Sequence, residues 1–415
     1  MPLPELIEIV PLTAPVTAQI TVPGSKSITN RALVLAALAE GEMTLTGALW
    51  SEDTQIMVEA LHAMGFSVSV ADDPVEQCNR TIVVKGEGGR IPKMPGEIFV
   101  GNAGTAARFL AALLCLGDGA VKLHGIDRMH KRPQGELFQA LRALGYTVES
   151  VNDKLPAVIH GTGSNAGACQ VSLRDSSQFA SALLLVAGAG DWKVDLIAAN
   201  LEEEPYIRMT QELISAFRKA GGRFAIEPDA SSGSYFLGVN SFAERVKVAN
   251  WPLTGWQIDA QFTRFISPPR EVSRQTDLGD SIMTAIVLAP LADRSTSFTD
   301  LGRLRVQECE RVQVLRTELT KCGAIIREEG NTLHVEPSPS LHGAEIETCN
   351  DHRVAMCFAL LGLKVPGIRL RNPACVKKTF PNFFQKLATA PPKGLGVVIQ
   401  DADGRSLSGE ELFAV

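Results

Sequence analysis

The stretch GNAGTAARFLAALLCLG, residues 101–117, indicates what kind of fold this chain adopts. Small and polar residues open it, and a run of alanine, leucine and other apolar residues follows. A helix that is apolar on nearly every side has no face to offer water, so it belongs in the interior of a domain. The stretch therefore predicts an interior helix.

Five further segments share this build, in which a short polar or glycine-containing opening precedes an apolar run. They are PGSKSITNRALVLAALAEG (23–41), DSSQFASALLLVAGAG (175–190), DASSGSYFLGVNSF (229–242), GDSIMTAIVLAPLA (279–292) and NDHRVAMCFALLGL (350–363). Each of them predicts another interior helix.

A second series of segments is amphipathic and ends in glycine before a short run of β-branched or aromatic residues. Its members are ALHAMGFSVSV (60–70), ALRALGYTVES (140–150), ISAFRKAGGRFAIE (214–227) and TELTKCGAIIRE (317–328). The glycine suits a left-handed C-cap, and the residues after it favour a strand. The interval of 80 residues from Gly65 to Gly145 exceeds a solenoid repeat of about 20 to 50 residues, so it indicates a larger repeated unit.

Six such units predict an α/β protein with two similar lobes, in which strands surround interior helices. We expect residues 22–227 to form one lobe, and residues 1–21 with 228–415 to form the other. The polar openings of several interior helices should converge on one region. Free N–H groups and helix dipoles both favour negative charge there, so this region is expected to bind anions.

The composition narrows the class of protein further. The 415 residues are 45% hydrophobic and 21% charged, which is typical of a soluble globular enzyme. The formal charge of −6 argues against non-specific nucleic-acid binding. The longest apolar stretch, 32–39, is too short to span a bilayer, and MPLPELIEIVPL does not resemble a signal peptide. Eight cysteines without a C-x-x-C pair suggest reduced thiols, no zinc site and a cytoplasmic location.

Several polar residues at the helix openings are candidates for anion binding. Lys26, Ser27 and Arg31 open the first interior helix, where a cation does not help helix stability, although exposed charges at a turn would look the same. Gly104 lies in a turn of small residues that lets a ligand approach the backbone, with Thr105 as a plausible N-cap.

Two more groups of candidate residues lie in similar places. Arg128 belongs to a basic run that could equally be a solvated loop. Ser176, Ser177 and Gln178 offer hydroxyl and amide groups that suit a phosphate, although ordinary N-capping would use them too. Each of these groups alone has an ordinary structural explanation, so only their combination with the other candidates indicates anion binding.

The second half of the chain offers carboxylates as well as cations. Asp280 precedes an interior helix, where it could be a simple N-cap. Glu308 and Arg311 stand three residues apart, as in a salt-bridged surface helix. Arg353 and Lys378 complete the set. Together these cations predict a cleft for polyanionic small molecules, with Asp280 and Glu308 available for proton transfer.

The motifs PGSKSITNRA, GNAGTAAR, DRMHKRP, DSSQF, DASSGSYF, RVQECER, NDHRVAM and KKTFP resemble those of the 5-enolpyruvylshikimate-3-phosphate synthases. The resemblance runs from about residue 20 to residue 388. It implies a two-lobed inside-out α/β barrel, with three βαβαββ units in each lobe. It also implies transfer of the enolpyruvyl group of phosphoenolpyruvate to the 5-hydroxyl of shikimate 3-phosphate, by a monomer that needs no metal or organic cofactor.

The resemblance also implies roles for individual residues. Phosphoenolpyruvate would be held by Lys26, Gly104, Arg128, Arg311, Arg353 and Lys378. Shikimate 3-phosphate would be held by Ser27, Arg31, Ser176, Ser177, Gln178, Tyr206 and Asp280. Asp280 would take the hydroxyl proton, and Glu308, assisted by Lys26, would deliver a proton to C3.

The chain departs from the family pattern at several positions. Gln307 replaces a lysine, and we expect Arg303, one helical turn away, to restore the charge towards the acceptor. Glu203 stands where relatives have a serine that contacts phosphate, and an acid there repels phosphate unless it is turned away or paired. Phe109 replaces a common proline.

These departures leave three alternatives open. The acceptor could be another cyclitol phosphate or a UDP-amino sugar, or the chain could be a catalytically weak paralogue that binds anionic metabolites. The UDP-sugar transferases use a loop cysteine, whereas Cys115 lies in an apolar run that disfavours a thiolate. Phosphate release with several acceptors would separate these alternatives.

Overall fold

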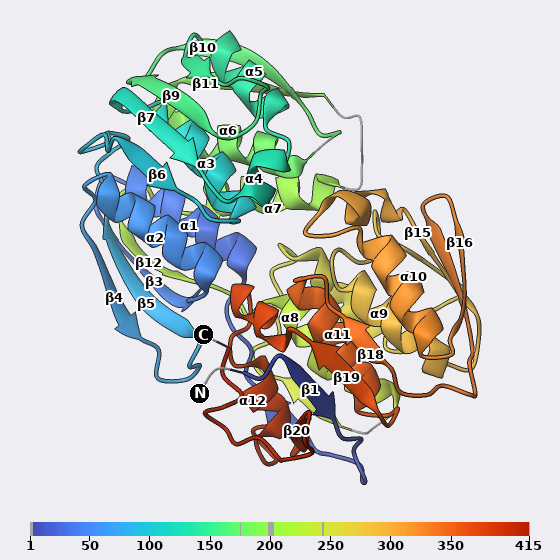
Figure 1. Cartoon of the computed structure of the whole chain (residues 1–415). Helices are drawn as coiled ribbons and strands as arrows, with labels where there is room; N and C mark the ends of the chain where they lie inside the picture. The colour runs from blue at the N-terminus through green and yellow to red at the C-terminus, as the bar shows by residue number, and fades with distance from the viewer. Residues whose placement is uncertain (1–2, 175, 198–202, 243–244, 415) are drawn as a thin grey trace. The chain divides into compact units, whose positions relative to one another are not determined.

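A computed structural model of the chain describes residues 3–174, 176–197, 203–242 and 245–414 (Figure 1). Asp175, the first residue of the DSSQF motif, lies outside the described residues. The chain divides into two compact units, Gly24–Glu227 and Met1–Pro23 with Pro228–Val415. We call the first the continuous unit and the second the split unit, because only the second is built from two separate chain segments.

The continuous unit contains seven described α-helices. They are α1 (Lys26–Leu38), α2 (Glu52–Ala63), α3 (Gly104–Leu114), α4 (Asp127–Lys131), α5 (Gly135–Ala143), α6 (Ser177–Gly190) and α7 (Glu204–Ala216). Its described strands are β3 (Glu42–Leu49), β4 (Val68–Asp72), β5 (Asn79–Lys85), β6 (Glu97–Phe99), β7 (Asp118–His124), β8 (Thr147–Glu149), β9 (Ala157–Thr162), β10 (Gly167–Ser172), β11 (Trp192–Ile197) and β12 (Gly222–Ala225).

The split unit contains five described α-helices and several short 3₁₀ helices. The α-helices are α8 (Ala230–Gly238), α9 (Ile282–Leu288), α10 (Arg311–Lys321), α11 (His352–Gly362) and α12 (Phe383–Ala388). The strands are β1 (Leu6–Ile9), β2 (Ala18–Ile20), β13 (Val246–Val248), β14 (Glu271–Ser273), β15 (Thr296–Thr299), β16 (Ile325–Glu329), β17 (Thr332–Glu336), β18 (Glu345–Glu347), β19 (Ile368–Arg371) and β20 (Ile399–Asp401).

Four sheets in the described part of the chain share one topology. Their strand orders are β12-β3-β5-β4, β6-β7-β9-β8, β14-β15-β17-β16 and β18-β19-β1-β20. In each, the first pair of strands is parallel and the next two pairs are antiparallel. Two smaller sheets, β10-β11 and β13-β2, are parallel pairs. Within the described ranges, each unit thus has two four-stranded sheets and one parallel pair.

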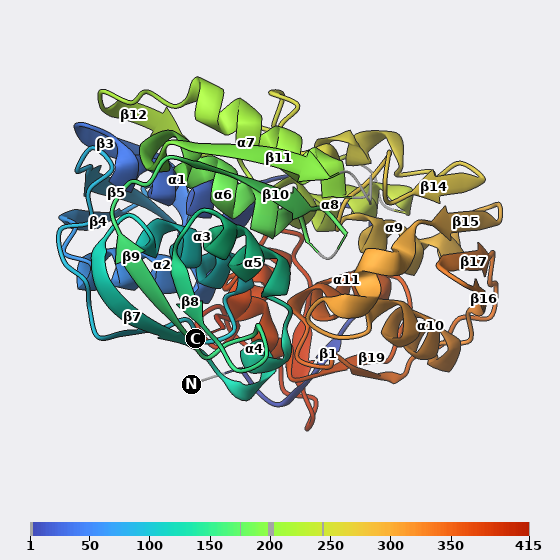
Figure 2. The same ribbon diagram turned by 90° about the horizontal axis from the view of Figure 1, so that it is seen from above.

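The predicted interior helices are confirmed. Every residue of α3 and of α9 is buried, and ten of the eleven residues of α11 are. In the continuous unit α1, α3 and α6 pack against one another, and Figure 2 shows α3 and α6 side by side. In the split unit α8, α9 and α11 pack against one another in the same way. A helix can be apolar on nearly all sides here because neighbouring helices and strands cover it.

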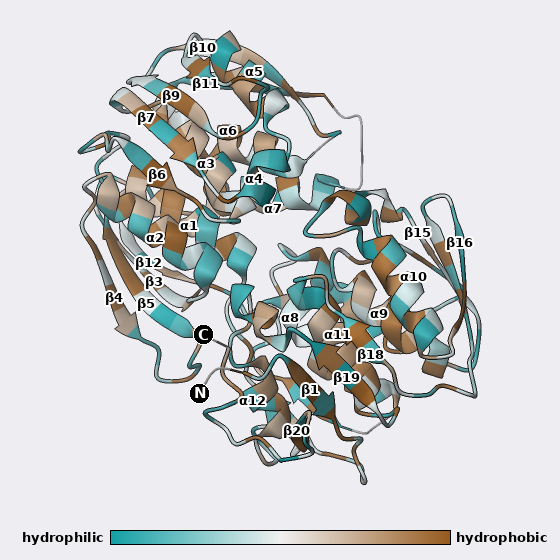
Figure 3. Ribbon diagram, viewed as in Figure 1, coloured by the Kyte–Doolittle hydropathy of each residue, from teal (hydrophilic) through white to brown (hydrophobic). Residues whose placement is uncertain are grey.

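The predicted amphipathic helices are also confirmed. Of the residues of α10, five are buried, and they recur at the spacing of one helix face; Figure 3 shows hydrophobic and hydrophilic colours alternating along this helix. A glycine with positive φ directly follows the C-cap residue of α2, α5 and α10: Gly65 at +82°, Gly145 at +91° and Gly323 at +81°. This left-handed conformation is easy for glycine, so the chain can leave the helix and enter the next strand. For α7 the predicted glycine cap is wrong, because the helix ends in the extended residue Phe217 and Gly221, at +95°, lies further along the chain.

None of the helices in the described part of the chain combines the length and the apolar composition that crossing a bilayer requires. Cys115 is buried at the end of α3, and burial raises the pKa of its thiol. A thiolate is therefore disfavoured there, as the sequence indicates.

Candidate active site

The opening of α1 carries three predicted site residues of the continuous unit, Lys26, Ser27 and Arg31. Lys26 Nζ lies 3.0 Å from Asp53 Oδ2, so a carboxylate pairs with its charge. Arg31 is only 2% exposed. The alternative that this arginine is an exposed charge at a turn is therefore wrong.

Hydrogen bonds hold the Arg31 guanidinium in a polar pocket inside the continuous unit. Its Nε donates to Thr210 Oγ1 at 2.8 Å and its Nη2 donates to Ser181 Oγ at 3.1 Å. Burial lowers the pKa of Arg31 to about 10, while Tyr206 and Glu203 act in the opposite direction. The side chain is thus a fixed cation at neutral pH, although water no longer solvates it.

The start of α6 brings together the three predicted polar residues of the DSSQF motif. Ser176 Oγ accepts a hydrogen bond from Gln178 N at 3.2 Å, so N-capping is confirmed for Ser176. Ser177 donates from both its N–H and its hydroxyl to Glu203 Oε2, at 3.1 and 2.6 Å. Gln178 Oε1 accepts from Arg108 Nη1 at 2.7 Å. Glu203 is thus paired with donors that the resemblance assigns to phosphate.

Gly104 begins α3, and two guanidinium groups lie directly over its backbone. A Cβ atom on Gly104 would stand 2.6 Å from nitrogens of both Arg108 and Arg132, so no larger residue fits without displacing them. The helix begins one residue before Thr105, so the prediction that Thr105 is the N-cap is wrong. Arg128, the arginine chosen from the sequence, is exposed on α4.

In the split unit, Asp280 lies among three arginines. Its Oδ2 is 3.0 Å from Arg353 Nη2, and its Oδ1 is 3.7 Å from Arg311 Nη1 and from Arg274 Nη2. The N-cap residue of α9 is Ser281, so the alternative that Asp280 is a simple N-cap is wrong. Burial raises the pKa of Asp280, but the three arginines outweigh burial and hold it well below its usual range.

Arg311 links two further carboxylates to this cluster. Its Nε lies 2.7 Å from Asp351 Oδ2, and its Nη2 lies 2.9 Å from Glu308 Oε2. Lys378 Nζ approaches the other oxygen of Glu308 at 3.1 Å. Burial lowers the pKa of Arg311, but the carboxylates, Asp351 first, outweigh burial and raise it above its usual value. At 1% side-chain exposure Arg311 is not part of a solvated surface helix.

We call Asp280, Glu308, Asp351 and the cations Arg274, Arg311, Arg353 and Lys378 the arginine–carboxylate cluster. Four cations face three carboxylates in this cluster, and two further carboxyl groups, Asp229 and Asp259, also act on Arg353. Burial weakens the screening by water, so guanidinium groups held here can bind an anionic group strongly.

A buried carboxyl group, Asp259, holds the turn that presents Asp280. Its Oδ1 accepts from Gly279 N at 2.7 Å, from Ser281 N at 3.2 Å and from Ser281 Oγ at 2.6 Å. These donors flank Asp280 on both sides, so they fix its backbone. Burial and the neighbouring Asp280 raise the pKa of Asp259, with the hydroxyls of Ser231 and Ser281 acting against them.

The segment around Gln307 does not form the helix that the sequence suggested. A 3₁₀ helix spans Leu301–Val306, Gln307 has a ψ of −134°, and α10 starts only at Arg311. Arg303 and Gln307 are therefore not one helical turn apart, and that prediction is wrong. The same break means that Glu308 and Arg311 do not share a helix, although their side chains are paired. The side-chain oxygen of Gln307 accepts a hydrogen bond from Arg311.

Sequence reasoning missed four residues that this geometry brings forward. They are Arg108, Asp259, Arg274 and Asp351. Asp351 is the most predictable of them, because it belongs to the NDHR motif and caps α11. Arg274 and Asp259 lie in short segments without periodicity, so no local pattern reveals them.

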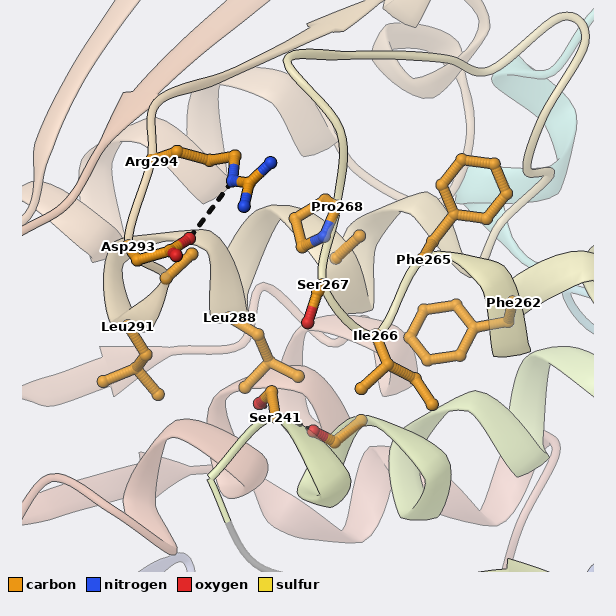
Figure 4. A pocket seen from close by; sticks show the side chains of 13 residues that line it. Ser241, Phe262, Phe265, Ile266, Ser267, Pro268, Leu288, Leu291, Asp293 and Arg294 are labelled. Carbon is orange, nitrogen blue, oxygen red and sulfur yellow. Dashed lines mark hydrogen bonds and ion pairs between the residues drawn. The ribbon is translucent and has the colours of Figure 1, made fainter.

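A separate cavity of about 250 Å³ lies in the split unit and contains none of the predicted site residues. Phe262, Phe265, Ile266 and Leu288 line it, and Figure 4 shows these side chains beside the Asp293–Arg294 ion pair. Phe262 belongs to a 3₁₀ helix, Ile258–Arg264, that packs against the interior helix α8.

Comparisons with known proteins agree on one family. The profile described as EPSP synthase (3-phosphoshikimate 1-carboxyvinyltransferase) matches residues 11–223 and 217–387. A 3-phosphoshikimate 1-carboxyvinyltransferase of Opitutus terrae is 37% identical over 95% of this chain and 100% of its own length. One from Rhizobium leguminosarum bv. trifolii is 38% identical over 96% of this chain and 99% of its own length.

Solved structures resemble the fold as well. EPSP synthase from Acinetobacter baumannii has a TM-score of 0.73 at 22% identity, covering 95% of this chain and all of that one. The enolpyruvyl transferase NikO from Streptomyces tendae has a TM-score of 0.70 at 15% identity, and the match covers 97% of this chain and 99% of that one. At these identities the likeness concerns the α/β fold alone.

Proposed function

The chain belongs to the EPSP synthase family, and from that premise we propose that it transfers the enolpyruvyl group of phosphoenolpyruvate to the 5-hydroxyl of shikimate 3-phosphate. The hydroxyl oxygen adds to C2 while C3 gains a proton. C3 then loses a proton and C2 expels inorganic phosphate, which leaves the enolpyruvyl ether. The observation that supports this assignment most is the arginine–carboxylate cluster, which pairs an ionised carboxyl group with cations able to hold an anionic substrate.

The cations have separate proposed tasks. Phosphoenolpyruvate carries a carboxylate and a phosphate, and fixed guanidinium groups neutralise both without reorganising as charge moves. We assign this substrate to Lys26, Gly104 N–H, Arg128, Arg311, Arg353 and Lys378. We assign shikimate 3-phosphate to Ser27, Arg31, Ser176, Ser177, Gln178, Tyr206, Asp280, Arg303 and Gln307.

Asp280 is the proposed base for the 5-hydroxyl. With its pKa held below the usual range it is ionised and able to accept a proton, but it is a weak base. An anionic substrate bound to Arg353 and Arg311 would offset their charge, and the proton affinity of Asp280 would then rise. Substrate binding would in this way activate the base.

Glu308 is the proposed proton donor to C3. Arg311 and Lys378 both contact its carboxylate, and cations favour the charged form. Donation requires the neutral form, so an anionic substrate must draw these cations away from Glu308. The same step that activates Asp280 would therefore favour protonation of Glu308.

We further propose the finer architecture that the family implies, a monomer with two inside-out lobes of three βαβαββ units. The repeated sheet topology and the buried helices of each unit support this proposal. Residues from both units are needed for the reaction as proposed. We expect the continuous unit to provide most contacts to shikimate 3-phosphate, and the split unit most contacts to phosphoenolpyruvate.

The test is phosphate release from phosphoenolpyruvate with and without shikimate 3-phosphate. We expect release only when both are present, and Arg353→Ala should lower kcat/KM for phosphoenolpyruvate by about 10² or more, because charge-assisted contacts that stabilise a transition state have that value. Arg294→Ala removes an exposed arginine of the same unit and should change nothing. Binding without turnover, or release with a different acceptor only, would contradict the proposal.

A further inference from the structure

Glu203 places a buried carboxylate on the opening of α6. It is 4% exposed, and one of its oxygens accepts from both the N–H and the hydroxyl of Ser177, at 3.1 and 2.6 Å. Glu203 is the N-cap residue of α7, yet its side chain makes no capping bond to that helix. Its carboxylate therefore binds the end of a different helix from the one that it begins.

The surroundings of this carboxylate are those of an anion site. The α6 terminus supplies N–H groups and a favourable helix dipole, and the buried serines supply hydroxyls. The field of Glu203 also reaches Arg31, where it acts to raise the pKa of that guanidinium. A donor pair, a helix end and a buried cation thus all act on one carboxylate.

A phosphate in this place would need the same donors. Ser177 cannot give its single hydroxyl proton and its N–H to two anions at once. Two anions brought together in a buried site also repel each other strongly, because little water screens them. Either the carboxylate leaves or the phosphate does not bind.

We propose that Glu203 is an internal competitor for the acceptor phosphate, and that it sets the affinity and selectivity of this subsite. The inference rests on the proposed function, which assigns Ser177 and Arg31 to the phosphate of the acceptor. Phosphorylated acceptors bind only by displacing Glu203, so they bind more weakly than the same donors would otherwise allow. Glu203 is a specificity-determining residue and takes no part in proton transfer.

The test compares Glu203→Ser and Glu203→Gln with the unchanged chain. Both variants remove the negative charge, so KM for shikimate 3-phosphate should fall by about tenfold or more, while KM for phosphoenolpyruvate should stay within about twofold, since a charge repulsion of one to two kcal/mol corresponds to such a factor. Glu204→Ser is the matched control, because Glu204 is the exposed neighbour and is expected to change neither constant.

Direct binding separates this proposal from the proposed function. Calorimetric titration with shikimate 3-phosphate, and with inorganic phosphate, measures the subsite even if no turnover occurs. Absence of turnover with tighter binding by both variants would reject the reaction and keep the role of Glu203. The glutamine variant must first show an unchanged circular dichroism spectrum and melting temperature. If it then binds these ligands no more tightly than the unchanged chain, the proposal that Glu203 competes with phosphate is wrong. If the serine variant fails to fold, the glutamine variant, which keeps the size of the side chain, decides alone.

Discussion

Asp280 has two roles, because its ionised side chain stabilises the fold and is also the proposed base of the reaction. Three arginines surround it, and without an anion between them their charges would repel one another in a poorly screened environment. Asp259 holds the adjacent turn through three hydrogen bonds, so the carboxylate of Asp280 has little freedom to move away. The electrostatics of the cluster and its geometry therefore depend on the same residue.

The pH dependence of stability follows from this arrangement. A carboxyl group whose folded pKa lies below its unfolded value of about 3.9 stabilises the fold above that pH, and loses this contribution as the pH falls towards the folded value. Asp280→Asn should therefore lower the free energy of unfolding by roughly 3 kcal/mol near pH 7, and the difference should shrink below about pH 4. Urea unfolding between pH 3 and 7 measures it.

The control for that experiment is Asp293→Asn, which removes a carboxylate from an exposed ion pair. We expect it to have a far smaller effect on unfolding, because water solvates both partners. A difference between the Asp280 variant and the unchanged chain that stays constant from pH 3 to 7 would contradict the electrostatic explanation.

At the level of helices and strands, the local sequence predicted the interior helices and most of the glycine turns correctly. The apolar run after GNAGT becomes α3, and the glycine after each amphipathic run takes a positive φ. These features depend on neighbours in sequence, so a local pattern reveals them. The partners of the charged residues do not: Lys26 and Asp53 are 27 residues apart, and Arg311 and Asp351 are 40 apart. Only the packing of separate elements brings such pairs together.

Two glycines make a matched test of backbone conformation. Gly188 is an exposed position inside α6, and Gly163 has a φ of +80°. An alanine Cβ at either position would not contact any other atom, so only the backbone conformation differs between the two substitutions. Gly188→Ala should raise the free energy of unfolding by about 0.5 to 1 kcal/mol, since alanine favours the helix. Gly163→Ala should lower it by about 1 kcal/mol, since alanine resists this φ. Thermal and urea unfolding would show opposite shifts, and shifts of the same sign would refute the argument.

For the whole molecule, the two units differ in how the chain builds them. The continuous unit is one uninterrupted segment, and its ends meet where Ser25 N donates to Glu227 O at 2.8 Å. The split unit needs its N-terminal segment, because β1 lies between β19 and β20 and β2 pairs with β13. Figure 1 shows the dark blue β1 beside the red β19.

This difference predicts how fragments behave. Residues 24–227 expressed alone should unfold in one cooperative transition, because they retain all strands of their three sheets. Residues 228–415 alone should lack stable tertiary structure, since removing β1 exposes the edges of two neighbouring strands and the core beneath them. Amide NMR spectra and heat unfolding distinguish the two. A fully folded 228–415 fragment would contradict the role of β1.

The position of β1 also has a consequence for biosynthesis. β1 is synthesised long before its two partners, Ile368–Arg371 and Ile399–Asp401. Until those strands leave the ribosome β1 has no sheet to join, whereas the continuous unit, which lies between them in the sequence, can already fold. Nascent β1 is therefore expected to bind chaperones, and its capture by β19 and β20 is expected to be a late step in maturation.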